Sequence, residues 1–384
     1  MRRVKIAILY QLSESWINVR SVFLYSKQRV DVECQVILLP FIHEQLDWSR
    51  EREEKFLSME GVDYICWDDP DFDFNVSGFD AVIFTSPYDS SRPQEYHFHS
   101  LKEKVAITAY IPYGLEVGGG IQNLEFQYRQ PVAAESTVTF VRSESAKKMF
   151  RMYCQNGDAH VVVTGHPRLD NFASFQEFNV DPELVAEISG RKAILWNAHF
   201  SFIDNCWSTF DVFAENIFFE ILSRPDFVLI FRPHPLLYKS LINAGIFTAH
   251  EIEEFKCELR TLGVIVDERS DHRHAFAASY ALLTDAGSFL LEYLVTGKPI
   301  LYLENIYGLG LNEQGAAVLE LCRKATELPH IVSFLDWLSF GQDDECELRR
   351  SAIDLFFYGL DGCCGLRVLN YILYISNRET AYGK

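Results

Sequence analysis

Thr284, Asp285, Gly287 and Ser288 lie in a polar turn between an apolar run of strand length and an apolar run of helical length. The first N–H groups of a helix have no partner inside the helix and carry partial positive charge, so this turn is suited to an anionic group, above all a phosphate. Gly287 lets the backbone approach the phosphate closely, and Ser288 adds a hydroxyl. Glu292, one turn into the helix, is placed to accept hydrogen bonds from a ribose. The alternative is that Asp285 or Ser288 only caps the helix and Glu292 faces water.

Two further polar groups follow predicted strands. Arg232 and His234 come after the strand DFVLI, within the sequence RPHP. Arg232 can donate two hydrogen bonds to one phosphate, and His234 can donate to a diphosphate leaving group or transfer a proton near neutral pH. His199 ends another strand, in WNAH, and is a candidate for lining the same site. The alternative for His234 is a loop histidine whose side chain is satisfied by the backbone, and the alternative for His199 is a capped, buried turn.

The first half of the chain holds three more candidate reactive side chains. Tyr113 and Glu116 lie after a predicted strand, on a loop that also contains the glycines 118–120. A loop with three consecutive glycines is either mobile or closely approached by another group, and it could fold around an acceptor. His166 lies in GHPRLD after another strand, where a structural role at a domain junction competes with catalysis. No GxGxxG or P-loop pattern is present.

The histidine pairs His97/His99 and His272/His274 do not predict a metal site. Residues two apart on a helix point their rings in different directions, and no cysteine or carboxylate has matching spacing. The GxSxG pattern of a nucleophile elbow is missing as well. We therefore predict neither a metal nor a cofactor, and a nucleotide-activated donor would be a substrate.

Both halves of the chain alternate predicted strands with segments long enough for helices. Strands are predicted at residues 5–12, 32–40, 62–67, 79–86, 105–112, 136–141, 160–165, 192–199, 226–230, 263–268, 280–283 and 300–303. Strands that are apolar throughout are typical of parallel sheets covered on both faces. After Asn312 no further strand is predicted, and the tail to Asn377 is predicted to be helical. The predicted fold is α/β, with two Rossmann-like domains at 1–170 and 171–384 and a cleft between them. This is the GT-B architecture, although periodicity does not separate it from other two-domain α/β folds.

Composition excludes several classes of protein. The net charge of −19 argues against a nucleic-acid binder with a broad basic face, and it disfavours wholesale adhesion to anionic lipid. The nine cysteines form no CxxC pair, which fits reduced thiols in a cytoplasm. The start MRRVKIAILYQL lacks a small-residue cleavage site, so we expect it to be the first strand and not a signal peptide. No apolar run approaches the ~20 residues that cross a bilayer.

Together these segments resemble the CDP-glycerol glycerophosphotransferase family of teichoic-acid and capsule synthesis. The resemblance is carried, in order, by GHPRLD, WNAH, RPHP, LLTDAGSFLLEYLVTGKPILY and DGCCGLRVLNYI, between Tyr110 and Ile372. It implies a GT-B enzyme that needs no metal and transfers a polyol phosphate from a CDP-linked donor to a growing polymer or a lipid-linked primer. The family's Arg-x-His element falls on Arg232 and His234, which implies diphosphate binding and a catalytic histidine.

Two departures from the family pattern bear on the chemistry. The family's Thr-Asp-Tyr-Ser-Ser element falls on residues 284–288, with Gly287 in place of the first serine. The family's His-Gly, which contains the proposed base, aligns with Tyr113 and Gly114, and a tyrosine is a poor base at neutral pH. Either Glu116 or His166 then takes the proton, or this member transfers another group.

We therefore expect a cytoplasmic transferase with an N-terminal acceptor domain and a C-terminal nucleotide-donor domain that has a helical tail. It would move glycerol phosphate, or a similar polyol phosphate, from a CDP-linked donor to a cell-surface polysaccharide or teichoic-acid-like acceptor. Peripheral contact with the inner face of the membrane is compatible with this role. The stretch TDAGSFLLEYLVTGKP is also similar to UDP-N-acetylglucosamine 2-epimerases and to GT-B glycosyltransferases. The alternatives are a transferase that uses a nucleotide sugar, such an epimerase, or a nucleotide-binding protein without turnover.

Overall fold

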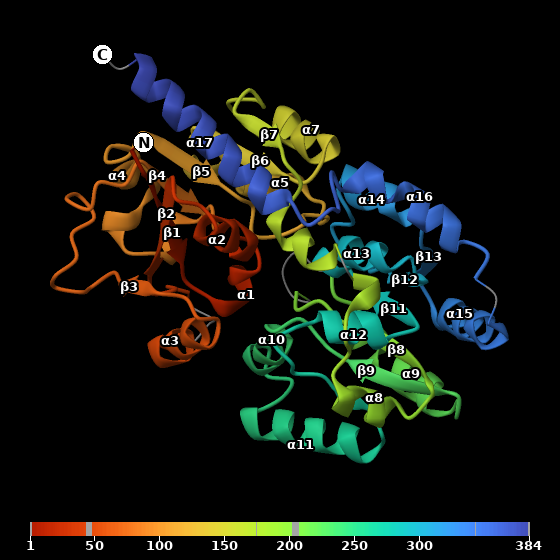
Figure 1. Ribbon diagram of the computed structural model, residues 1–384. Helices are drawn as coiled ribbons and strands as arrows, with labels where there is room; N and C mark the ends of the chain where they lie inside the picture. Colours follow the sequence, from red (N-terminus) through yellow and green to blue (C-terminus); the bar gives the residue numbers. More distant parts are fainter. Residues whose placement is uncertain (1, 44–47, 174, 202–206, 342, 383–384) are drawn as a thin grey trace. The chain divides into compact units, whose positions relative to one another are not determined.

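The computed structural model describes residues 2–43, 48–173, 175–201, 207–341 and 343–382 (Figure 1). The chain forms two compact units, each built around one parallel sheet with helices. Unit 1 comprises Met1–Gly114, Leu124–Ala173 and Asp354–Lys384, and unit 2 comprises Leu115–Asn123 and Ser174–Ile353. The sequence-derived domain 1–170 therefore contains residues 115–123 of unit 2, and the sequence-derived domain 171–384 contains residues 171–173 and 354–384 of unit 1.

The sheet of unit 1 has seven parallel strands in the order β3-β2-β1-β4-β5-β6-β7. Its strands are β1 Val4–Tyr10, β2 Val32–Leu38, β3 Tyr64–Cys66, β4 Ala81–Phe84, β5 Ile107–Tyr110, β6 Val138–Val141 and β7 Val161–Val163. Its helices are α1 Ser13–Trp16, α2 Arg20–Lys27, α3 Arg50–Met59, α4 Phe98–Lys102, α6 Pro131–Glu135, α7 Glu144–Tyr153 and α17 Cys364–Tyr382, and α5 Ile121–Tyr128 starts in unit 2 and ends in unit 1. Every residue of β4, β5 and β6 is buried, as expected for strands covered on both faces.

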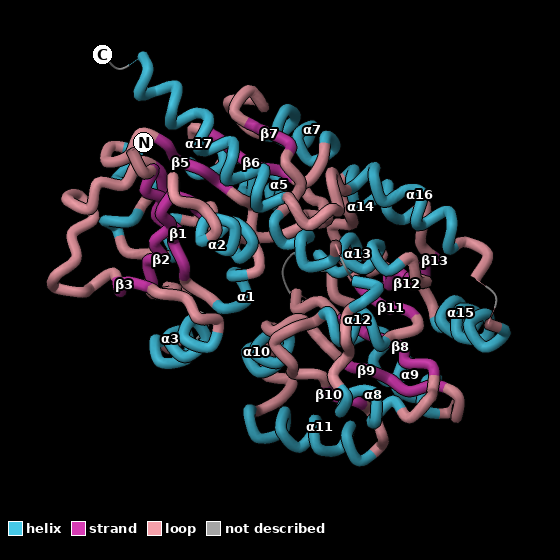
Figure 2. The backbone as a smooth tube through the Cα atoms, in the orientation of Figure 1, coloured by secondary structure: helices cyan, strands magenta, loops and turns pink. Residues whose placement is uncertain are grey.

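The sheet of unit 2 has six parallel strands in the order β10-β9-β8-β11-β12-β13. Its strands are β8 Lys192–Asn197, β9 Phe227–Phe231, β10 Ile265–Val266, β11 Ala281–Thr284, β12 Ile300–Leu303 and β13 Arg323–Ala325. Its helices are α8 Pro182–Ile188, α9 Phe210–Leu222, α10 Leu237–Asn243, α11 Ala249–Thr261, α12 Arg273–Ala278, α13 Ser288–Glu292, α14 Glu313–Leu319 and α15 Leu328–Phe340, and α16 Cys346–Phe356 crosses from unit 2 into unit 1 (Figure 2). The prediction that no strand follows Asn312 was wrong, because β13 pairs with β12.

The C-terminal helix α17 packs in unit 1, alongside α2 (Figure 1). Both carboxylate oxygens of Asp170, the last residue of GHPRLD, accept backbone N–H groups at the start of α17, from Cys364 and Gly365, each at 2.8 Å. A Cβ on Gly365 would lie 2.4 Å from the Ser21 hydroxyl oxygen, so only glycine allows this approach to α2. The sequence GHPRLD therefore anchors the tail of the chain. No helix in the described part of the chain is both long and apolar enough to span a membrane.

Candidate active site

The strand order of the second sheet reverses beside β8, which has β9 on one side and β11 on the other. In open α/β sheets, ligands bind at the carboxyl ends of strands next to such a reversal. The three polar groups predicted in this half follow β8, β9 and β11, so they lie together at that edge. Backbone contacts join them. The His234 N–H donates to the Ala198 carbonyl at 2.9 Å, and the Asn197 side-chain amide donates to the Arg232 carbonyl at 2.8 Å.

The buried side chain of Asp285 connects the loops at this edge through hydrogen bonds. Its side chain is buried and accepts hydrogen bonds from the His199 N–H at 2.8 Å, the Thr209 hydroxyl at 2.5 Å and the Thr209 N–H at 3.3 Å. Burial raises the pKa of Asp285 to about 7, and these donors limit the rise. Thr284 is also buried, with its hydroxyl 3.3 Å from the Asp285 carbonyl oxygen. Asp285 thus positions the loop after β8, and the side chains of Asp285 and Thr284 do not face solvent.

The two histidines of the site are neutral hydrogen-bond donors. The Nδ1 of His199 accepts from the Ser201 N–H at 3.1 Å, and the Nδ1 of His234 accepts from the Leu236 N–H at 3.2 Å. A neutral imidazole whose Nδ1 accepts carries its proton on Nε2, which is then the donor. Burial lowers the pKa of His199 to about 3, helped by the nearby His234, and lowers that of His234 to about 4. The two ring centroids lie 5.7 Å apart, and the Phe200 ring packs 4.5 Å from each.

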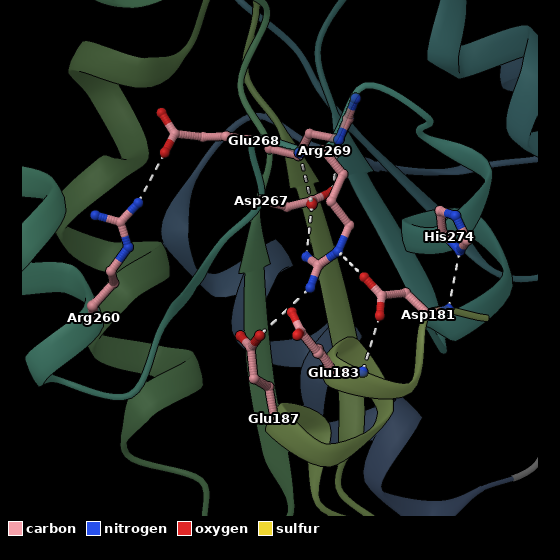
Figure 3. A network of polar contacts seen from close by, with 9 residues as sticks. Asp181, Glu183, Glu187, Arg260, Asp267, Glu268, Arg269 and His274 are labelled. Carbon is pink, nitrogen blue, oxygen red and sulfur yellow. Dashed lines mark hydrogen bonds and ion pairs between the residues drawn. The ribbon is translucent and has the colours of Figure 1, made fainter. Parts of the chain in front are cut away.

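Arg232 is oriented by a buried carboxylate. Its Nη1 donates to Asp267 at 2.7 Å, and the Asp267 side chain is fully buried while that of Arg232 is 15% exposed. The other oxygen of Asp267 accepts from Arg269 at 3.0 Å, and Arg269 also bonds Asp181, the residue that caps α8, at 2.6 Å (Figure 3). This ion-pair network fixes the position of the guanidinium, because a carboxylate shared by two arginines leaves few alternative arrangements.

Gly287 in the turn before α13 has free space beside it, and Glu292 at the end of α13 is buried. A Cβ on Gly287 would have only the Asn197 side-chain oxygen within contact, at 4.0 Å, so the space beside the helix start is unfilled by protein. Ser288 is the first residue of α13 and is half-buried. Glu292 is fully buried and lies 3.0 Å from Nε2 of His272. Glu292 therefore does not face water, and a ribose would have to reach it beside His272.

Glu116 and the glycine loop belong to unit 2 and are packed. The Gly119 N–H donates to the Gly310 carbonyl at 2.9 Å, and the Asn312 amide donates to the Glu116 carbonyl at 3.2 Å. A Cβ on Gly119 would lie 2.7 Å from a backbone oxygen, so the glycine is needed for close packing of two loops. The Trp207 indole N–H donates to the same Gly310 carbonyl at 2.7 Å, and its ring stands edge-on to His199, with centroids 5.7 Å apart.

Tyr113 and His166 lie in unit 1, at the carboxyl edge of its sheet. His166 is buried, with Nε2 2.7 Å from the Pro112 carbonyl oxygen and Nδ1 accepting the Arg168 N–H at 3.2 Å. Because both ring nitrogens contact the backbone, these contacts fit a positioning role for His166 better than proton transfer. The Tyr113 hydroxyl lies 3.2 Å from that of Tyr88, and Tyr113 is 39% exposed.

Comparison with known proteins identifies the family. Residues 121–373, well over half of the chain, match the model of the family described as CDP-glycerol:poly(glycerophosphate) glycerophosphotransferase. The chain belongs to this family.

Solved structures show the same fold at low sequence identity. A UDP-N-acetylglucosamine 2-epimerase has a TM-score of 0.66 and 15% identity, covering 98% of this chain and 97% of its own. The epimerase of Neisseria meningitidis bound to UDP-GlcNAc has a TM-score of 0.62 and 15% identity, covering 97% and 100%. A variant of the wall teichoic acid polymerase TagF with CDPG has a TM-score of 0.62 and 14% identity, covering 99% and 90%. No curated protein matches the chain by sequence.

The predicted fold class, family and enzyme class are thereby confirmed. As a member of the CDP-glycerol:poly(glycerophosphate) glycerophosphotransferase family, the chain is a transferase whose donor is CDP-glycerol and whose acceptor is a poly(glycerophosphate). The GT-B expectation agrees with two parallel sheets of seven and six strands.

Sequence reasoning missed the residues that support the side chains of the candidate site. Asp267 directly follows β10 and lies near the carboxyl end of the predicted strand 263–268, so its position at a strand end was a usable signal. Thr209 and Ser201 lie between β8 and α9, where no periodic pattern marks them. Their roles follow from hydrogen bonds to Asp285 and His199, and those contacts exist only in the folded chain.

Proposed function

We propose that unit 2 binds the diphosphate of CDP-glycerol at the carboxyl edge of β8, β9 and β11. Arg232, the backbone at Gly287 and Ser288, and the Nε2–H groups of His199 and His234 are the donors to the phosphate oxygens. The observation that carries the proposal is the Nδ1 geometry, because it leaves both neutral imidazoles with a proton on Nε2. Glu292 is proposed to accept a ribose hydroxyl.

The proposed reaction is a single displacement at phosphorus. An acceptor hydroxyl oxygen forms a bond to the β-phosphorus, and the bond from that phosphorus to the bridging oxygen breaks. CMP leaves with the bridging oxygen, and the hydroxyl proton passes to solvent water. Phosphoryl transfer has a loose transition state with charge growing on the leaving group, so a fixed donor near the leaving phosphate stabilises it. His234 is assigned this role, and Arg232 holds the diphosphate in both ground and transition states.

Unit 1 is proposed to bind the acceptor. Of the residues named as possible bases, Tyr113 is exposed at the carboxyl edge of this unit, Glu116 belongs to unit 2, and His166 has both ring nitrogens in contact with the backbone. A loose transition state requires little proton removal before the phosphorus is attacked, so a hydrogen-bonding hydroxyl at this position is compatible with turnover.

The proposed place of action is the cytoplasm, with peripheral contact to the inner face of a membrane that carries a lipid-linked acceptor. All eight cysteines in the described part of the chain are free thiols, as expected in a reducing compartment. Sedimentation with vesicles that do or do not contain anionic lipid tests the membrane contact. Full recovery of the protein in the supernatant with both kinds of vesicle would refute it.

Calorimetric titration of CDP-glycerol, CDP, CMP, UDP and GDP tests the donor site. We expect a preference for cytidine nucleotides in the wild type that is lost in Arg232→Ala and retained in Arg260→Ala. Arg260 is a matched control, because it is an arginine of the same unit whose ion pair with Glu268 lies outside the site (Figure 3). A preference for uridine or guanosine diphosphates would instead support a nucleotide-sugar transferase or an epimerase. Binding of CDP-glycerol without CMP release, when acceptor is supplied, would indicate a binding protein without turnover.

A further inference from the structure

Three carboxylates contact the guanidinium of Arg269, which lies in the loop between β10 and α12 (Figure 3). Its Nη1 donates to Asp267 at 3.0 Å, its Nε donates to Asp181 at 2.6 Å, and its Nη2 lies 3.5 Å from Glu187. Asp181 is itself held in place, because its N–H donates to Nδ1 of His274 at 3.0 Å. All five residues belong to unit 2, so the loop that carries Arg269 is tied to the start of α8.

The buried carboxylate of Asp267 is divided between two arginines. One oxygen accepts from Nη1 of Arg232 at 2.7 Å. The other oxygen accepts from Nη1 of Arg269 at 3.0 Å and from the Arg269 N–H at 3.3 Å. Among the residues that the structure describes, Asp267 is the one hydrogen-bond partner of the Arg232 guanidinium, and it contacts Nη1 alone. Nη2 and Nε of Arg232 are therefore left for a ligand.

The position of Arg269 bears on how Arg232 pairs with Asp267. A guanidinium that faces a carboxylate commonly forms two parallel hydrogen bonds, one to each oxygen. Between Arg232 and Asp267 such a pair would use a second nitrogen of Arg232 and withdraw it from a ligand. Arg269 opposes this pair, because it already occupies the second oxygen of Asp267. Asp181 keeps Arg269 in this place, since it binds a different nitrogen of the same guanidinium.

We propose that Arg269 is a positioning residue for the diphosphate of the donor and acts through Asp267 on Arg232. By occupying one oxygen of Asp267, it keeps Nη2 and Nε of Arg232 available to the phosphate oxygens. This inference rests on the proposed function and deepens it, because it adds a residue that determines the affinity for the donor. Arg232 holds the diphosphate in ground and transition states alike, so loss of Arg269 should raise the KM of CDP-glycerol more than it lowers kcat.

The test is a double-mutant cycle on the full chain, with the affinity for CDP measured by calorimetry. The four proteins are the wild type, Arg269→Met, Arg232→Ala and the variant that carries both changes. Methionine keeps the length of the side chain and removes its donors. We expect about tenfold weaker binding in Arg269→Met, the size of one lost hydrogen bond to a charged group. In the Arg232→Ala background the same change should alter the affinity by less than about twofold, because its effect requires Arg232.

CMP release from CDP-glycerol supplies the kinetic comparison. Arg269→Met should raise the KM of CDP-glycerol about tenfold and change kcat by less than about threefold. Arg260→Met is the matched control, because Arg260 is an arginine of the same unit that pairs with Glu268, the residue before Arg269. If Arg269→Met does not fold, Arg269→Lys replaces it in the cycle. A lysine amine lacks the fork that spans two carboxylates, so the expected loss of CDP affinity is about threefold and should again vanish in the Arg232→Ala background.

Three results would overturn the role of Arg269. The first is wild-type CDP affinity in Arg269→Met, and the second is a fall in kcat at unchanged KM. The third is an equal loss of affinity with and without Arg232, which would mean that Arg269 acts only on the stability of the fold. Failure of the proposed donor site gives a different pattern, because Arg232→Ala would then bind CDP as tightly as the wild type and both proposals would be refuted.

Discussion

The neutral-donor role of His234 predicts different outcomes for two substitutions at one position. In His234→Gln the amide nitrogen lies near the former Nε2 and can still donate, whereas His234→Ala has no donor. A hydrogen bond to a charged group contributes about 1.5–3 kcal/mol. If that bond forms only in the transition state, its loss lowers kcat by about 10- to 150-fold. We expect a loss of this size in the alanine variant and a loss below about tenfold in the glutamine variant, with little change in KM for CDP-glycerol.

The assay is CMP release from CDP-glycerol between pH 5 and 9. Because burial lowers the pKa of His234 to about 4, this residue stays neutral over the whole range and should add no step to the pH profile. Both variants lose the acceptor for the Leu236 N–H, so similar unfolding temperatures in the two variants are the control. The reasoning is refuted if the glutamine variant is as slow as the alanine variant and the wild-type rate falls as pH rises through about 6.5, because those results require a protonated histidine.

Three further predictions concern stability. Asp285→Asn turns a hydrogen-bond donor toward Thr209 or the His199 N–H, and should lower the free energy of unfolding in urea by about 1–3 kcal/mol and weaken CDP binding. The unfolded chain protonates His234 at about pH 6.5, and the folded chain does so only near pH 4. The contribution of the neutral side chain to the free energy of unfolding is therefore complete above pH 6.5 and is lost as the pH falls toward 4. The loss of stability from pH 7 to 5 should therefore be about 2 kcal/mol smaller in His234→Gln than in the wild type. Gly165→Ala places a Cβ 2.4 Å from the Tyr358 carbonyl oxygen and should release the C-terminal helix to protease, whereas Gly157→Ala, with a similar φ and open space, should not.

The buried strands were predictable because burial on both faces requires continuous apolar runs. The strands β8, β9 and β11 coincide with such apolar runs, and the polar residues after each run mark where the strand ends. Parallel pairing then brings those ends to one edge, so the meeting of His199, Arg232 and Asp285 could be inferred before any contact was known.

Other features had no comparable local signal. β13 has the sequence RKA, which is short and charged because it lies at the edge of its sheet. The return of α17 to unit 1 depends on Asp170 and Gly365, which are far apart in sequence. Asp285 was predicted to face a phosphate, and its burial beneath the His199 loop depends on Thr209, which periodicity does not identify.

The acidic character of the chain is compatible with an anionic donor substrate. The proposed site binds the diphosphate through oriented N–H dipoles and carries little excess positive charge. Arg232 already shares Asp267, both histidines are neutral donors, and the helix start offers N–H groups. Exposed charges separated by more than about 8 Å are largely screened at physiological salt, so the remaining acidic surface contributes little there. CDP affinity measured by calorimetry should therefore fall less than about threefold between 50 and 300 mM salt. A fall of tenfold or more would mean that binding depends on several exposed cations, and the dipole-based site would have to be abandoned.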